Sequence, residues 1–305
     1  MDLPDELRIG IQGIAASFHD EAARKFFPNH RITPLPAPSF PLLCKALREK
    51  TSDVALMAIE NSIAGSILPN YSLLESNLFQ ILGEVYLRIK MNLLALPGQK
   101  LKEIQFVKSH PMALLQCEDF LLSCPWMKIL EGSDTAASAK EIQETGRHGY
   151  AAIASQLAAE TYGLELMRTG IETNPKNYTR FLVICRGEDY PTFLNANFAN
   201  FANFNETLKA HPASKPNKAS FRFEVPDQPG SLVRILKILD HYSVNMTHLQ
   251  SVVIPGRPYE YSFHVDLEWT DADAYRLAME QIQTQALRII HFGIYPKGER
   301  PLDCH

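Results

Sequence analysis

The chain has 305 residues, of which 46% are hydrophobic and 21% charged, the balance of a globular protein with two or three domains. Its net charge of −4 excludes a surface basic enough to neutralise many phosphates, so we expect no nucleic-acid partner. The five cysteines include no CxxC pair, which predicts reduced thiols in a cytoplasmic protein. The acidic N-terminus shows no signal segment. No apolar run is long enough to span a bilayer, so we expect no membrane contact.

Short apolar runs alternate with helical patterns from residue 7 to residue 186. We expect strands at Arg8–Gly13, Asp53–Ile59, Ile104–Val107, Ala151–Ser155 and Phe181–Cys185. Helices are expected at Phe40–Lys50, Pro111–Ser123, Thr135–Thr145 and Gln156–Tyr162. This alternation predicts an α/β region with mostly parallel strands, in which ligands bind at the carboxyl ends of the strands.

A segment rich in Asn, Pro, Lys and Ala follows at residues 187–218. It contains NANFANFANFN, in which Phe198, Phe201 and Phe204 recur at three-residue spacing. We interpret it as a linker whose aromatic rings pack on a neighbouring domain, with a dedicated ligand platform as the alternative.

The C-terminal region, residues 219–305, has a more regular pattern. Strands are expected at Phe221–Val225, Asn245–Ile254, Tyr259–Glu268 and Arg288–Tyr295, and helices at Leu232–Tyr242 and Asp271–Ala286. Thr270 and Asp273 resemble a capping box at the start of the second helix. The order βαββαβ predicts a ferredoxin-like unit, an architecture that hosts many functions.

Small hydroxyl and amide side chains recur at the predicted strand ends. The set comprises Ser17, Asn61, Ser62, Ser109, Thr135, Ser155, Asn177 and Thr179, joined by His19, His110 and Arg180. Such groups can bind a small anion by hydrogen bonds, although each alone could equally be a cap or turn residue. There is no metal-ligand spacing, Gly-rich phosphate loop or GxSxG motif, so we expect neither a metal nor a cofactor.

Five segments, in this order, resemble signatures of the prephenate dehydratase family. They are AIENSIAGSILPNYSLL (58–74), SHPMALLQC (109–117), DTAASA (134–139), AAIASQLAAETYGLELM (151–167) and NYTRF (177–181). The resemblance implies a two-lobed catalytic domain of the type II periplasmic-binding-protein class over residues 1–186. It also implies a linker at 187–218 and an ACT regulatory domain at 219–305.

By the same resemblance, the reaction is the decarboxylative dehydration of prephenate to phenylpyruvate in L-phenylalanine biosynthesis. The TRF triplet supplies the implied catalytic residues Thr179, Arg180 and Phe181. A threonine hydroxyl is a weak acid, so we expect Thr179 to donate a hydrogen bond to the leaving oxygen. In an extended segment Thr179 and Phe181 face one side and Arg180 the other. Arg180 is then either a carboxylate ligand or a brace for the loop.

The implied substrate-binding residues are Ser17, His19, Asn61, Ser62, His110, Thr135, Ala136 and Ser155. The first motif departs from the family pattern, because Ala16 replaces a glycine and His19 replaces a serine. We expect Ala16 to indicate a turn without positive φ. His19 could assist protonation, although we favour a role as a helix cap. Met112 stands where the family has glutamine and removes one polar contact.

The segment DQPGSLVRIL resembles the effector turn of ACT domains, with a helix N-terminus suited to a carboxylate. The implied effector residues for L-phenylalanine are Asp227, Gly230, Ser231, Leu232, Val233 and Asn245. The family's second effector motif, ESRP, is degraded here, since Gln250-Ser251 is followed by Val252-Val253. ACT domains pair side by side in related proteins, which implies a homodimer or homotetramer.

Two rival functions stay open at this point. An arogenate dehydratase would act on the amino-acid analogue of prephenate, and residues 62–65 lie where such specificity could be set. A catalytically inactive amino-acid-binding sensor is the non-enzyme alternative, against which the retained Thr179, Asn61 and Thr135 argue.

Overall fold

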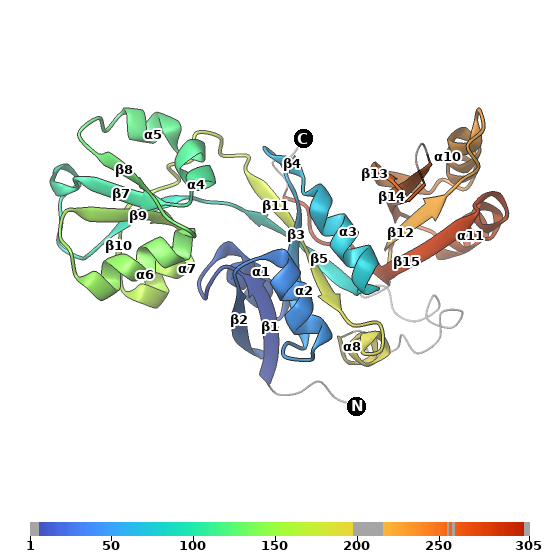
Figure 1. The fold of residues 1–305 in the computed structure, drawn as a ribbon, viewed down its shortest axis with the longest axis horizontal. Helices are drawn as coiled ribbons and strands as arrows, with labels where there is room; N and C mark the ends of the chain where they lie inside the picture. Colours follow the sequence, from blue (N-terminus) through green and yellow to red (C-terminus); the bar gives the residue numbers. More distant parts are fainter. Residues whose placement is uncertain (1–5, 198–215, 255, 258–259, 302–305) are drawn as a thin grey trace. The chain divides into compact units, whose positions relative to one another are not determined.

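The computed structural model describes residues 6–197, 216–254, 256–257 and 260–301 (Figure 1). Phe198, Phe201 and Phe204 of the predicted linker lie outside these residues. The described chain divides into two compact units. We call residues 6–70 and 85–183 the N-terminal unit, and residues 71–84 and 184–298 the C-terminal unit.

The first sheet has the strand order β2-β1-β3-β11-β5, with the short β4 paired to β3. Its elements are β1 (Glu6–Gln12), α1 (Phe18–Phe26), β2 (Arg31–Ala37), α2 (Phe40–Arg48), β3 (Val54–Asn61), β4 (Gly65–Ser66), α3 (Leu68–Asn77), β5 (Gln80–Arg88) and β11 (Tyr178–Cys185). β1 pairs in parallel with both β2 and β3. β2 was not predicted because Pro34 and Pro36 interrupt it, and its place at the sheet edge explains how it tolerates them.

The second sheet, wholly within the N-terminal unit, has the order β10-β6-β9-β7-β8. Its elements are β6 (Asn92–Ala95), the 3₁₀ turn η1 (Leu101–Glu103), β7 (Phe106–Ser109), α4 (Pro111–Gln116), α5 (Glu118–Leu122), β8 (Lys128–Glu131), α6 (Thr135–Thr145), β9 (Tyr150–Ala154), α7 (Gln156–Tyr162) and β10 (Glu165–Thr169). β7 runs parallel to β8 and β9, whereas β6 is antiparallel to β9 and β10. The expected two-lobed α/β region is confirmed.

The single helix predicted at Pro111–Ser123 is wrong, because the chain forms α4 and α5 with a break at Cys117. Cys117 has non-helical angles of φ −111° and ψ 23° and is fully buried. Thr173 binds both sides of the break. Its N–H donates to the Gln116 carbonyl at 2.8 Å, and its Oγ1 accepts from the Asp119 N–H at 3.2 Å. A loop distant in sequence thus satisfies the backbone groups that the break exposes.

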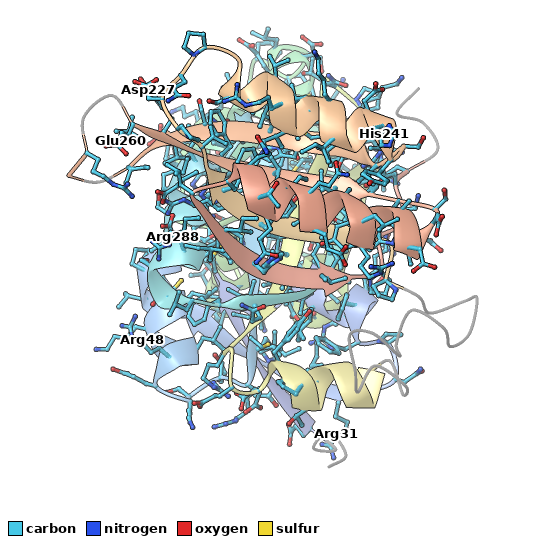
Figure 2. The ribbon with its side chains drawn as sticks, turned by 90° about the vertical axis from the view of Figure 1, so that its right-hand side faces the viewer. Arg31, Arg48, Asp227, His241, Glu260 and Arg288 are labelled. Carbon is cyan, nitrogen blue, oxygen red and sulfur yellow. The ribbon has the colours of Figure 1, made fainter. Side chains whose placement is uncertain are left out.

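The C-terminal unit contains the expected ferredoxin-like βαββαβ arrangement. Its elements are α8 (Tyr190–Asn197), β12 (Lys218–Glu224), α10 (Ser231–His241), β13 (Asn245–Val253), β14 (Tyr261–Glu268), α11 (Ala272–Gln285) and β15 (Arg288–Tyr295). The antiparallel sheet has the order β13-β14-β12-β15, and α10 and α11 lie side by side on one face (Figure 2). The predicted capping box at Thr270 is wrong, since Asp271 caps α11 by accepting from the Asp273 N–H at 2.9 Å.

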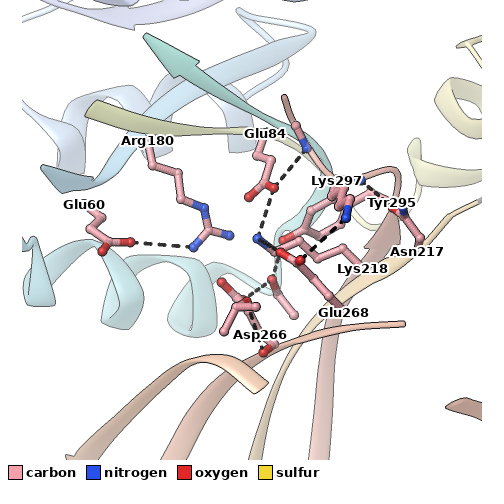
Figure 3. Close-up of polar contacts among 12 residues, drawn as sticks. Glu60, Glu84, Arg180, Asn217, Lys218, Asp266, Glu268, Tyr295 and Lys297 are labelled. Carbon is pink, nitrogen blue, oxygen red and sulfur yellow. Dashed lines mark hydrogen bonds and ion pairs between the residues drawn. The ribbon is translucent and has the colours of Figure 1, made fainter. Parts of the chain in front are cut away.

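The two faces of β12 differ in chemistry. Phe221 and Phe223 lie in the apolar core with residues of α10 and α11. The alternate residues are polar yet buried, among them Lys218, which is 1% exposed. Its ammonium lies 3.0 Å from Glu84 of β5 and 3.2 Å from Glu268 of β14 (Figure 3). Segment 71–84, which the sequence analysis assigned to the catalytic domain, thus contributes to the compact C-terminal unit.

Candidate active site

A cavity of about 240 Å³ lies within the N-terminal unit, where polar side chains follow the carboxyl ends of strands. The first lobe contributes the end of β3, the start of α1 and residues of β11, and the second contributes α4 and the start of α6. The lining residues are Gln12, Ser17, Phe18, His19, Ala58, Asn61, Ile67, Ile89, Met91, His110, Met112, Ala113, Gln116, Ser133, Asp134, Thr135, Thr179 and Phe181. Apolar walls with a few converging polar groups are typical of small-molecule sites.

Thr179 lies on the cavity wall and is held by Asn61. The Asn61 Nδ2 donates to Thr179 Oγ1 at 3.0 Å. The orientation of this amide is fixed, because Asn61 Oδ1 accepts from the backbone N–H groups of Ile63 and Ala64 at 3.0 and 2.8 Å. Since Thr179 Oγ1 accepts from Asn61, its own proton can be donated into the cavity.

A chain of amides continues from Asn61 to the second lobe. Its Nδ2 also donates to Asn177 Oδ1 at 2.8 Å, and Asn177 Nδ2 donates to Gln116 Oε1 at 2.9 Å. Asn177 is fully buried, while Gln116 lines the cavity. The residues preceding Thr179 therefore join the two lobes at the cavity wall.

The loop after β1 shows two departures from the sequence-based predictions. Ala16 has φ +66°, so the expectation that its turn avoids positive φ is wrong. Contacts on both sides hold it there, because its N–H donates to Asp20 Oδ2 at 2.7 Å and its carbonyl accepts from Ser155 Oγ at 3.0 Å. The expected capping role of His19 is also wrong, since Ser17 is the N-cap of α1.

His19 instead lies on the cavity wall, 9% exposed, with its ring edge-on to Phe181 at a centroid distance of 4.9 Å. Its Nε2 is buried without a hydrogen-bond partner. Burial lowers the pKa of His19 to about 3, so the imidazole is neutral near pH 7. Its free ring nitrogen can donate or accept a hydrogen bond with a ligand, but the ring carries no charge.

The second lobe brings His110, Asp134 and Thr135 to the cavity. His110 caps α4, because its Nδ1 accepts from the Met112 N–H at 3.2 Å, which leaves the proton of the neutral ring on Nε2. Asp134 caps α6, because its Oδ1 accepts from the Ala137 N–H at 2.9 Å. Burial raises the pKa of Asp134, while backbone N–H groups and the nearby His110 oppose that shift.

Four residues of the predicted site do not line the cavity. Arg180 is 4% exposed, and its Nη1 lies 4.0 Å from Glu60 Oε2 (Figure 3); the predicted alternation with Thr179 and Phe181 is confirmed. Ser62 donates to the Lys176 carbonyl and accepts from the Tyr178 N–H, and so pins the start of β11. Ser155 caps α7, and Ala136 is fully buried on α6.

Sequence reasoning did not place Asp134 or Gln116 in the site, although both belong to segments quoted for the resemblance. Asp134 directly precedes the helix predicted at Thr135–Thr145, and a carboxylate that caps a helix gives no separate sequence signal of a site. Gln12 follows the strand pattern of β1 and was not considered. Ile89 and Met91, in the connection between the lobes, lacked any signal of a site.

The described part of the chain holds no group of three or more His, Cys, Asp or Glu residues placed to bind a metal ion. No lysine or arginine is among the described residues that line the cavity. None of the helices described is long and apolar enough to span a membrane.

The predicted effector residues lie around α10. Gly230, with φ +81°, occupies the N-cap position, and Ser231 begins the helix. Leu232 and Val233 follow in its first turn, and Val233 is 50% exposed. Asn245 begins β13, after the far end of the helix. Figure 2 shows Asp227 and His241 at opposite ends of α10.

Comparisons with known proteins give consistent results. A family model described as prephenate dehydratase matches residues 9–189. A relative from Arabidopsis thaliana, "Arogenate dehydratase/prephenate dehydratase 1, chloroplastic", is 31% identical over 306 residues, covering 95% of this chain and 72% of the relative.

Two solved structures match the chain over most of its length. GqqA, described as a novel type of quorum quenching acylase, gives a TM-score of 0.76 at 28% identity, covering 95% of this chain and 98% of that one. The prephenate dehydratase from Arthrobacter aurescens in complex with L-Phe gives a TM-score of 0.75 at 23% identity, with coverages of 95% and 90%. The latter similarity supports the fold.

Proposed function

The chain belongs to the prephenate dehydratase family, and on this premise we propose that it converts prephenate to phenylpyruvate by decarboxylative dehydration. The observation that carries this proposal is the hydrogen bond from Asn61 to Thr179 on the cavity wall. Because the Thr179 oxygen accepts from Asn61, the Thr179 hydroxyl proton can be donated to the substrate. Neither a metal nor a redox partner is needed, because the reaction gains its driving force from aromatisation of the ring.

The electron flow assigns a role to each wall of the cavity. The bond between the ring and its carboxylate breaks, carbon dioxide leaves, and the released electron pair completes the aromatic ring. The ring C–O bond breaks at the opposite carbon, and the departing oxygen leaves as hydroxide that becomes water with a proton from solvent. Thr179 donates a hydrogen bond to this oxygen as its negative charge develops. Phe181, Ile89 and Met91 exclude water from the ring carboxylate, which favours its loss as neutral carbon dioxide.

The remaining predicted residues take supporting roles in this proposal. Ser17, His19, His110 and Thr135 contact the substrate from the cavity wall. Arg180 braces the start of β11 through Glu60, and Ser62, Ser155 and Ala136 act through the loops and helices they hold. A test is to follow phenylpyruvate formation from prephenate by ultraviolet absorbance with the wild type and with Asn61→Asp. The aspartate cannot donate to Thr179, so we expect kcat to fall while the protein stays folded.

An acylase function, as in the description of GqqA, has less support from this geometry. A threonine nucleophile needs a neighbouring group that accepts the hydroxyl proton. The group bonded to Thr179 Oγ1 is the Asn61 amide, which donates to it. Hydrolysis of an N-acyl amide substrate by the purified protein would contradict this argument.

For regulation, we propose that L-phenylalanine binds at the Asp227–Leu232 turn and lowers activity. Gly230 holds a left-handed conformation before α10, where backbone N–H groups can bind a carboxylate. The 11 residues of α10 separate this turn from Asn245 by about 16 Å, more than one phenylalanine spans. A site that uses both therefore needs two chains, which supports a homodimer or homotetramer. The solved prephenate dehydratase in complex with L-Phe supports L-phenylalanine as the ligand.

The compartment stays a prediction. The sequence favours the cytoplasm, whereas the relative from Arabidopsis thaliana is named as chloroplastic.

A further inference from the structure

Asp134 lines the cavity but has no role in the proposed mechanism. Among the described lining residues it is the only carboxylic acid, and no lysine or arginine stands among them. His19 is neutral in this environment. The described wall of a site that must receive an anionic substrate thus presents a carboxyl group and no lysine or arginine.

The need for a helix cap does not explain this charge. Asp134 Oδ1 accepts from the Ala137 N–H at 2.9 Å, but asparagine and serine cap helices about as well as aspartate. The second carboxylate oxygen, Oδ2, lies on the side of the loop after β1. A Cβ built on Gly13 would stand 2.7 Å from it, and Gly13 has φ +91°. The chain therefore leaves room for this carboxylate where a side chain at residue 13 would displace it.

The two forms of the substrate differ in the group that such a carboxylate would meet. Prephenate carries two carboxylates and a keto group, so it presents no cation to Asp134 and is repelled by it. Its amino-acid analogue, arogenate, carries an ammonium group in place of the keto oxygen. An ammonium group forms a charge-assisted hydrogen bond with a carboxylate, which is stronger in a partly buried site than in water.

We infer that Asp134 determines substrate specificity by binding the ammonium group of the amino-acid form, and so raises the preference for arogenate over prephenate. This inference rests on the proposed function and concerns the same cavity. It moves the specificity determinant from residues 62–65, where the sequence analysis placed it, to the second lobe. Ser62 pins the start of β11 instead.

The test compares kcat/KM for both substrates in the wild type and in Asp134→Asn. Asparagine keeps the cap of α6 and removes only the charge. The preference for arogenate should fall about 10-fold to 100-fold, the range for losing one hydrogen bond to a charged group. Glu141→Gln is the control, because Glu141 lies on the same helix but is exposed and pairs with Lys108 at 2.7 Å. It should leave the preference unchanged.

Asp134→Ser provides a second capping variant, so that a folding defect particular to asparagine does not decide the outcome. Equal changes in kcat/KM for both substrates in a folded variant would overturn the inference and leave the proposed function standing. A wild type that converts prephenate but not arogenate would overturn it as well. If the folded wild type does not aromatise prephenate, the proposed function itself fails.

Discussion

Replacing Thr179 with valine removes the hydroxyl that the proposed mechanism requires and keeps the branched shape that suits a strand. In a transition state where this hydroxyl donates to the departing oxygen, its loss should lower kcat by about 10²-fold to 10³-fold, or about 2.7–4 kcal/mol. KM should change little, because the interaction strengthens mainly as charge develops on the oxygen. Thr179→Ser should retain part of the activity, since it restores a donor.

The structure also predicts a small effect of this change on stability. In Thr179→Val the Asn61 Nδ2 keeps two acceptors, Asn177 Oδ1 at 2.8 Å and the Tyr178 carbonyl at 3.2 Å. No donor is left unsatisfied, so the free energy of unfolding should fall by about 1 kcal/mol or less. The assay measures kcat, KM and Tm, with Thr145→Val as a control that removes a hydroxyl bonded at 2.8 Å to the Glu141 carbonyl. A Thr179→Val protein with a lower Tm and nearly normal kcat would refute a catalytic role for Thr179.

Four further predictions follow from other features. Dialysis against EDTA should leave activity intact, because the described residues offer no metal site; activity regained only with a divalent ion would contradict the mechanism. Lys218→Met should lower the free energy of unfolding by about 3–5 kcal/mol, because it removes the buried ammonium that lies 3.0 Å from Glu84 and 3.2 Å from Glu268, and an unchanged urea midpoint would disprove this. His19 binds a proton in the unfolded chain at pH values below 6.5 but in the folded protein only below about 3, so its burial lowers the free energy of unfolding as the pH falls through this window. His19→Gln should therefore show a smaller drop in Tm between pH 7 and pH 4 than the wild type. An equal drop would refute the lowered pKa of His19. Gly230→Val should abolish the response to L-phenylalanine without loss of catalysis, because φ +81° is strained for valine, and inhibition that persists in this variant would place the effector elsewhere.

The sequence predicted the parts of the site that depend on strand periodicity. Thr179 and Phe181 share a face because alternation in β11 is a property of any extended chain. Asn61 was included in the predicted site because it follows the apolar run of a strand, and ligands in α/β sheets bind at the carboxyl ends of strands. Both expectations rest on local geometry that one sequence is enough to define.

Features that depend on distant contacts were not predictable in this way. The positive φ of Ala16 is maintained by Asp20 and Ser155, and the latter lies 139 residues away. The break at Cys117 depends on Thr173. In each case a tertiary contact overrides the local preference of the residue, and no pattern near the residue reports that contact.

The most direct test of the central claim is to mix the purified protein with prephenate and measure phenylpyruvate formation. The account predicts turnover without any added cofactor, and a loss of about 10²-fold or more in kcat when Thr179 is valine. A folded wild-type protein that forms no phenylpyruvate from prephenate would contradict it.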